Sequence, residues 1–248
     1  MTSDNKRQSI RERRLKKQRQ RRFSVILVVT AVALVLVGLG FLPTAIKALT
    51  PVGEIVVPEP TQRSSVDFNT MGNPDAPVVI VEYSDYQCPY CKRHADETEP
   101  LITENHVETG EVYYIRRSFG NYISDNLQRG RTESIDSAEA AYCAGDQEKF
   151  WEYKDILYAN WLGEDAGSYT EKRLMAMAEA LNLDMDQFRS CFTDHKYREL
   201  AQQDRFDGTK EGINSTPGFL INGKYILGAQ PYAVFAQEIQ AALAASGN

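Results

Sequence analysis

The longest apolar run in the chain covers residues 23–46, which contain no charged side chain. A helix needs about 20 apolar residues to cross a bilayer, whereas the apolar core of a cleaved signal peptide has only about 7–15. Ten of the 22 residues before the run are basic, and few basic residues follow it closely. This asymmetry predicts a transmembrane anchor at 23–46, with a basic cytoplasmic tail at 1–22 and the remaining chain outside the cytoplasm. A cleaved signal peptide is the alternative interpretation.

Prolines interrupt the chain after this run. They stand at positions 51, 58, 60 and 74. Such a segment is typical of a semi-extended spacer. Residues 47–75 are therefore predicted to be a linker that holds a folded domain, residues 76–248, away from the membrane.

An apolar, β-branched run at residues 77–84 predicts a buried central strand. Pro89, a few residues later, suits the first turn of a helix, because the missing N–H of proline costs nothing there. That helix is expected to bend near Pro100 and to end at Gly110. A second strand is predicted at 111–119, so that strand, helix and strand form a β-α-β unit.

Helical periodicity then replaces the strand pattern. Residues from about 130 to 212 contain several predicted helical segments and form an insertion in an α/β frame. Two short strands follow at 219–221 and 224–227, joined by Asn-Gly at 222–223, the strongest short signal for a hairpin turn. A last helix has its apolar residues on one face between 232 and 243. The predicted order is β-α-β, helical insertion, β-β-α.

The distribution of charge adds to this picture. Hydrophobic residues make up 42% of the 248 residues and charged residues 25%, which is typical of a globular protein. The formal net charge is −6, but residues 1–22 contribute +8 and the remaining residues −14. A nucleic-acid-binding protein carries its basic surface on the folded part. The acidic body therefore argues against nucleic-acid binding.

Four cysteines, Cys88, Cys91, Cys143 and Cys191, all lie in the part of the chain that is predicted to be exported. Disulfides form and persist outside the cytoplasm. A bond between Cys143 and Cys191 would close a long loop within the helical insertion and stabilise it. We therefore predict a structural disulfide there, with two buried free thiols as the alternative.

The C-x-x-C spacing of Cys88 and Cys91 is compatible with a zinc site, a structural disulfide or a redox-active dithiol. A structural zinc site needs four ligands, and neither the two distant cysteines nor the three histidines form a second close pair. A disulfide across so small a loop would stabilise the fold little. A redox dithiol explains more, because Cys88 would precede a helix whose unpaired N–H groups and dipole stabilise a thiolate. Cys91, one turn inward, could resolve a mixed disulfide. No metal and no cofactor is expected.

Two segments resemble a known family. VEYSDYQCPYC, residues 81–91, and STPGFLING, residues 215–223, resemble the DsbA-like thiol:disulfide oxidoreductases of the thioredoxin-fold superfamily. AYCAGDQEKFWEYKDILY resembles the helical region of that family, and the resemblance covers about residues 65–246. It implies an α/β thioredoxin fold with a helical insertion, here preceded by one transmembrane helix.

The resemblance also implies roles for individual residues. Cys88 and Cys91 match the redox dithiol of the family. Thr216-Pro217 matches a loop whose proline is cis and lies beside the dithiol, where the preceding residue offers backbone hydrogen bonds to an extended substrate. Glu82 matches an acid beneath the active site that would tune the protonation of the cysteines. The alternative for this residue is an exposed glutamate at the end of a strand.

The two residues between the cysteines, Pro89 and Tyr90, are expected to tune the dithiol. DsbA-type oxidases often have a histidine at the position of Tyr90, which helps to hold the thiolate. Pro-Tyr also occurs in glutaredoxins and in some isomerases and reductases of this fold, and a threonine before the proline resembles the isomerase-type relatives. A less oxidising disulfide is therefore expected here.

The resulting hypothesis is a membrane-anchored, extracytoplasmic enzyme that exchanges disulfides with exported proteins, most simply as an oxidase. A substrate thiolate would attack Cys88, and a quinone-linked membrane partner would reoxidise the pair, the latter by analogy with the family. The close alternative is a reductase or isomerase kept reduced by a membrane electron donor. The alternative from another class is a membrane-tethered, non-catalytic peptide-binding module.

Overall fold

The computed structural model describes residues 51–247 and, upstream of them, residues 16, 17, 19, 22–24, 27–30, 32, 33, 35 and 37. Within this part of the chain, no helix has both the length and the apolar composition needed to span a bilayer. The predicted cytoplasmic tail at 1–22 and the predicted anchor at 23–46 lie mostly outside the described residues. Residues 52–248 make up one compact unit.

The core of this unit is a five-stranded mixed sheet in the order β1-β3-β2-β4-β5. The strands are β1 (Thr70–Met71), β2 (Val78–Ser84), β3 (Val112–Ser118), β4 (Gly218–Ile221) and β5 (Lys224–Leu227). β2 and β3 run parallel, and the other three neighbouring pairs are antiparallel. The apolar run that forms β2 lies at the centre, where both of its edges are paired. The predicted β-α-β and β-β-α order is confirmed.

The helices that follow β2 divide where proline interrupts them. α2 (Pro89–Glu97) stops before α3 (Glu99–Ile102), which has proline in its first turn, and a π-helical segment, η1 (Thr103–Val107), follows. The insertion between β3 and β4 holds α4 (Tyr122–Leu127), α5 (Glu133–Gly145), α6 (Phe150–Ala159), α7 (Glu171–Ala180), α8 (Met185–Thr193) and α9 (Arg198–Lys210). It begins earlier than predicted, because the polar α4 has no periodic apolar pattern. α10 (Tyr232–Ser246) ends the fold.

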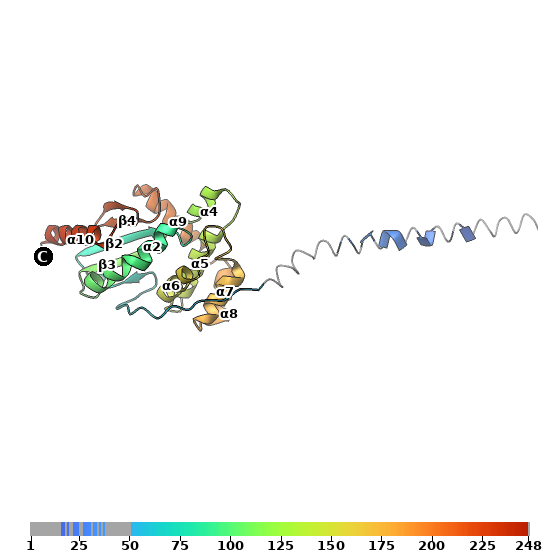
Figure 1. The fold of residues 1–248 in the computed structure, drawn as a ribbon, viewed down its shortest axis with the longest axis horizontal. Helices are drawn as coiled ribbons and strands as arrows, with labels where there is room; N and C mark the ends of the chain where they lie inside the picture. Colours follow the sequence, from blue (N-terminus) through green and yellow to red (C-terminus); the bar gives the residue numbers. More distant parts are fainter. Residues whose placement is uncertain are drawn as a thin grey trace, which may run out of the picture. The chain divides into compact units, whose positions relative to one another are not determined.

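Alternating side chains of the sheet face two different layers. On one face, Phe219 of β4 contacts Phe235 of α10 at 4.8 Å between ring centroids, and His94 of α2 contacts both rings. On the other face, Tyr83 of β2 packs against α9, where Gly208 leaves no room for a Cβ atom. Figure 1 shows α7 and α8 at the end of the domain opposite α10. The sheet is thus covered on both sides.

The predicted linker at 47–75 is corrected by the structure, since the part that is described is bound to the domain. The backbone of Val56 exchanges two hydrogen bonds with the side chain of Asn160. The side chain of Arg63 is buried and pairs with Asp155 at 2.8 Å. Phe68 stacks on Tyr142 with ring centroids 5.4 Å apart, and β1 adds an edge strand. Residues 51–63 form neither helix nor strand, but their backbone and side chains pair with groups of the folded domain.

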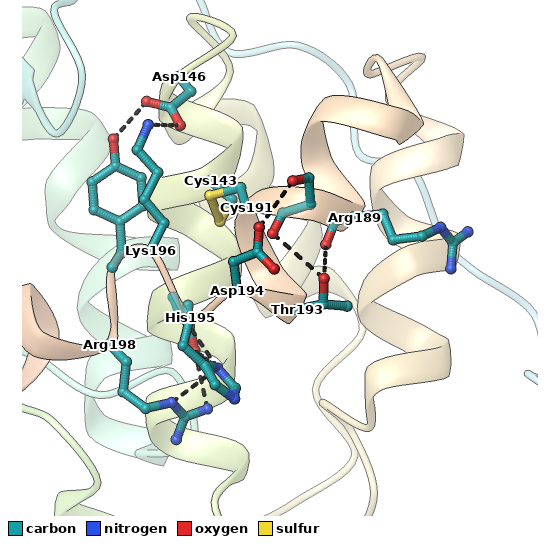
Figure 2. The surroundings of a disulfide bond; sticks show 12 residues. Cys143, Asp146, Arg189, Cys191, Thr193, Asp194, His195, Lys196 and Arg198 are labelled. Atoms are coloured by element: carbon teal, nitrogen blue, oxygen red, sulfur yellow. Dashed lines mark hydrogen bonds and ion pairs between the residues drawn. A yellow bond between two sulfur atoms is a disulfide. The ribbon is translucent and has the colours of Figure 1, made fainter.

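A disulfide joins Cys143 of α5 to Cys191 of α8. Figure 2 shows charged side chains around it, among them Asp146 and Lys196, which form an ion pair at 2.6 Å. The bonded cysteines are 48 positions apart in the chain. Because the cross-link closes a long loop, it restricts the unfolded chain more than the folded one.

Loss of this disulfide should lower the free energy of unfolding by about 2–4 kcal/mol, because the loop is then free in the unfolded state. The measurement is urea unfolding with and without reductant, in a Cys88→Ala, Cys91→Ala background so that only this disulfide responds. Adding Cys143→Ala and Cys191→Ala should remove the response to reductant. An unfolding midpoint that reductant leaves unchanged in the background variant would contradict a stabilising disulfide.

Candidate active site

The dithiol lies at the N-terminus of α2. Cys88 is the residue before the helix and has an extended backbone, and Pro89 occupies the first turn. Proline fits there because the first-turn N–H groups have no partner within the helix, and its fixed φ suits the helix. The free N–H groups and the dipole of α2 therefore point toward the sulfur of Cys88, and they favour a negative charge on it.

The thiol of Cys88 is only 3% exposed and lies against the loop before β4. The Thr216–Pro217 peptide bond is cis, and the Sγ of Cys88 lies 3.3 Å from the carbonyl oxygen of Thr216. A hydrogen bond from the Cys91 thiol, together with the N–H groups of Tyr90 and Cys91, lowers the pKa of Cys88 to about 7, although burial opposes this. Cys88 is therefore substantially ionised at neutral pH.

Cys91 has the opposite character. It is fully buried, and both cysteines are free thiols in this structure. Burial raises the pKa of the Cys91 thiol well above its usual value, and the nearby charges of Cys88 and Glu82 act in the same direction. The pair thus consists of one sulfur that ionises readily and one that retains its proton.

Glu82 lies in β2 with no exposed surface, so it is not an exposed glutamate at a strand end. It accepts hydrogen bonds from Arg116 at 2.6 Å and from Tyr114 at 2.9 Å. Burial alone would raise the pKa of this carboxyl group, but the charge of Arg116, acting together with smaller effects such as the hydrogen bond with Ser84 and the charge of Lys154, lowers the pKa overall. Glu82 is therefore an ionised, paired carboxylate whose charge acts on Cys91.

Arg116 was not among the residues that the sequence singled out. Its guanidinium also donates to Ser84 at 2.9 Å and to Tyr158 at 2.5 Å, and it lies over the rings of Tyr86 and Tyr158. The alternation of residues along the predicted strand 111–119 could have shown that Arg116 is buried, because it places Arg116 on the same face of the strand as apolar side chains. A buried arginine requires an acid, and Glu82 is its partner in register on the adjacent strand.

His94, on the buried side of α2, completes the polar group beneath the dithiol. Its Nε2 atom lies 3.2 Å from the hydroxyl of Tyr114. Since Tyr114 has one proton and donates it to Glu82, His94 must donate from Nε2. Burial lowers the pKa of His94 to about 4, so its ring is neutral at physiological pH.

A groove of about 820 Å³ opens beside Cys88. Tyr90 is 57% exposed at its edge. The guanidinium of Arg93 lies over the Tyr90 ring at 5.3 Å and donates to the carbonyl of Ala229 at 2.9 Å. Other residues of the lining include Ile123, Glu164, Thr216, Leu227, Gln230 and Pro231. The arrangement can hold an extended segment of polypeptide next to a reactive sulfur.

Comparison with known proteins supports this description. A family model described as thioredoxin matches residues 65–241. A Na(+)/H(+) antiporter, NhaA 1, of Salinispora arenicola is 31% identical over 171 residues, which are 69% of this chain and 23% of that protein. The chain therefore spans about a quarter of the length of the curated relatives it matches first.

Two further proteins match a larger share of their own length. A probable disulfide bond formation protein D of Bacillus anthracis is 26% identical over 158 residues, or 62% of this chain and 69% of that protein. The crystal structure of alpha-DsbA1 from Wolbachia pipientis has a TM-score of 0.59 and 22% identity, covering 72% of this chain and 92% of that one. At that identity the structural match establishes the fold.

The two thiols should react very differently with an alkylating agent. For the reduced protein, labelling of Cys88 by iodoacetamide should rise with pH and reach half of its maximum near pH 7, because the thiolate is the reactive form and the pKa of Cys88 is about 7. Cys91 should stay unlabelled over that range, because it is buried and its pKa is raised. Mass spectrometry of the labelled peptides separates the two sites. A Cys88 midpoint near 8.5, the value of an unperturbed thiol, would count against this assignment.

Proposed function

The chain belongs to the thioredoxin family, and we propose that it is a DsbA-like thiol:disulfide oxidoreductase acting through Cys88 and Cys91. The observation that carries the proposal is the pair of thiols at the start of α2. One has its pKa lowered to about 7 beside an open groove, and the other is buried with a raised pKa. Thiol–disulfide exchange needs one accessible sulfur that is attacked or attacks, and a second that resolves the mixed disulfide.

In the oxidising direction, the thiolate of a substrate attacks Sγ of Cys88 in the Cys88–Cys91 disulfide. The bond between the two enzyme sulfurs breaks, and Cys91 leaves with the electron pair and takes up a proton, as its raised pKa requires. The second thiolate of the substrate then attacks the substrate sulfur of the mixed disulfide, and Cys88 leaves as a thiolate. The substrate has lost two electrons, and the enzyme dithiol has gained them.

Thr216 and Pro217 are the proposed substrate contacts at the sulfur. The carbonyl oxygen of Thr216 already lies 3.3 Å from Sγ of Cys88, so an extended peptide whose cysteine reaches Cys88 would pass along this loop. Strand addition, in which main-chain groups of the peptide pair with an exposed edge, is the mode that suits such a groove. This role rests on proximity and on the resemblance to the family.

The setting of the reaction is part of the proposal. The uncharged run at 23–46 and the basic residues before it support an anchor that places the domain outside the cytoplasm. There, exported proteins with cysteines would be the substrates, and a membrane redox protein would restore the disulfide. The reverse direction, a reductase or isomerase, is favoured by one feature: the pKa of about 7 at Cys88 resembles that of thioredoxin, about 7, more than that of DsbA, about 3.5.

The two cysteines should behave differently when each is replaced. A Cys91→Ser variant should accumulate mixed disulfides with substrate proteins through Cys88, because nothing remains to resolve them on the enzyme side. A Cys88→Ser variant should trap little, because Cys91 has no exposed surface and, unlike Cys88, does not line the groove. Both variants are incubated in reduced form with a model protein that contains a disulfide, and non-reducing gels measure the adducts. The Cys88 thiolate attacks one sulfur of that disulfide, and the other substrate sulfur leaves as a thiol. Equal trapping by the two variants would overturn the assigned roles.

The reduction potential of the pair should lie between those of DsbA and thioredoxin, about −120 and −270 mV. A Tyr90→His substitution should make it less negative, because a cationic ring beside Cys88 stabilises the thiolate and hence the reduced form. Each unit by which the pKa of Cys88 falls corresponds to about 30 mV. Equilibration with glutathione buffers measures the potential, and Tyr90→Phe is the control that adds no charge. Identical reduction potentials for the histidine and phenylalanine variants would contradict the view that the residue at position 90 tunes the dithiol through its charge.

A further inference from the structure

The residue before Cys88 is a glutamine whose side chain is completely buried. A buried amide is costly unless its donors and its acceptor are paired. The Nε2 atom of Gln87 donates to the hydroxyl oxygens of Ser124 at 2.7 Å and Ser134 at 2.9 Å, and its Oε1 atom accepts from the backbone N–H of Asp165. One side chain thus joins α4, the start of α5 and the loop between α6 and α7.

Two of these segments also line the groove. Ser124 stands beside Ile123 in α4, and Asp165 stands beside Glu164 in the loop, and both neighbours belong to the lining. Ser124 also donates to the Asp165 carboxylate at 2.9 Å, which ties the two segments to each other. The groove wall formed by α4 and this loop is therefore fixed from behind by Gln87.

The apolar contacts of α4 come from half-buried residues: Tyr122 packs edge-on against Phe119, and Ile123 packs against the core. Of the six residues of α4, Ser124 is the one that is buried. Other bonds to α4, from Tyr122 to the Asn214 carbonyl and from Arg205 to Asp125, are exposed to solvent, where such contacts are weak. The side-chain bonds of Gln87 are buried, so their loss would leave polar groups without partners in the interior.

The backbone around Gln87 strengthens the same connection. Its N–H donates to the carboxylate of Asp85 at 2.9 Å, and the other oxygen of that carboxylate accepts from the N–H of Ile123 at 2.9 Å. Its carbonyl accepts from the indole N–H of Trp161 at 3.0 Å. The residue next to the reactive cysteine is therefore held to both parts of the wall through side chain and backbone.

We propose that Gln87 is a positioning residue for polypeptide substrates: its buried amide holds α4 and the 160–169 loop at the distance from Cys88 that an extended chain requires. This inference rests on the proposed function. The hydrogen bonds of its side chain reach the wall and not the sulfurs. Gln87 therefore acts on how a large substrate is held, while the intrinsic reactivity of the dithiol is independent of it.

The test compares a large and a small substrate of the same chemistry. Oxidation of a reduced two-cysteine peptide of a dozen residues is measured beside oxidation of dithiothreitol, which does not need the groove. Oxidised glutathione, which takes up the two electrons, restores the Cys88–Cys91 disulfide after each turnover in both assays. The main variant is Gln87→Met, which keeps the length of the side chain and removes its hydrogen bonds. For the peptide, kcat/KM should fall by about tenfold or more, mostly through KM, because buried groups of the wall lose their partners. The rate with dithiothreitol should change less than twofold, and the alkylation midpoint of Cys88 should stay near pH 7.

Gln147→Met is the matched control. Gln147 also makes two side-chain hydrogen bonds, to the backbone of Asp184, but it lies away from the groove. Its replacement should leave the ratio of peptide to dithiothreitol rates unchanged. If Gln87→Met does not fold, a Ser124→Ala, Ser134→Ala variant removes the bonds of Gln87 to α4 and α5 from the other side and should give a selective loss in the same direction.

The outcomes separate the inference from the function on which it rests. An equal loss for both substrates, or a shifted Cys88 midpoint, would mean that Gln87 acts on the dithiol, and an unchanged KM for the peptide would mean that the wall stands without it. Either result overturns the inference and leaves the enzyme assignment intact. A wild-type protein that oxidises neither substrate would overturn the proposed function itself.

Discussion

The ion pair between Glu82 and Arg116 is the constraint around which the domain is organised. The two residues are partners in register on the parallel strands β2 and β3, at the centre of the sheet. Burying such a pair is costly unless further hydrogen bonds surround it. Tyr114 and Ser84 supply some of these bonds from the sheet, but Tyr158 comes from α6 in the helical insertion. The hydrogen bonds around the charges beneath the dithiol are therefore complete only when the insertion is packed against the sheet.

The same helix carries a second buried charge, and the N-terminal segment takes part in it. Lys154, one turn before Tyr158 in α6, contacts both carboxylate oxygens of Glu99 in α3. Arg63 reaches the same Glu99 at 3.3 Å and pairs with Asp155. Acids and bases are equal in number in this cluster and in the Glu82 pair, so no net charge is buried. The thioredoxin-like frame, the insertion and the segment before β1 are thus one electrostatic unit.

The sequence predicts what local patterns encode. The β-branched run of β2, the Asn-Gly turn before β5 and the helix that starts at Pro89 are all readable from neighbouring residues. β1 was missed because two residues hold no alternation, and their strand exists only through pairing with β3. The partner of Glu82 lies 34 positions away, and those of Gln87 lie 37 to 78 positions away. Such contacts depend on how the strands are aligned and on how the helical insertion packs back against the sheet. No local sequence pattern encodes either of these.

The ion pair between Glu82 and Arg116 affects the reactivity of the dithiol through the proton on Cys91. Cys91 is buried and lies near the charge of Glu82, and both effects raise its pKa, so it keeps its proton at neutral pH. That proton is the one that Cys91 donates in a hydrogen bond to Cys88, and this bond is the main cause of the low pKa of Cys88. Glu82 can act in this way only while it is ionised, and the charge of Arg116 is the largest of the effects that keep it ionised. A carboxylate that would repel a thiolate directly thus promotes one at Cys88, because it holds the proton on Cys91.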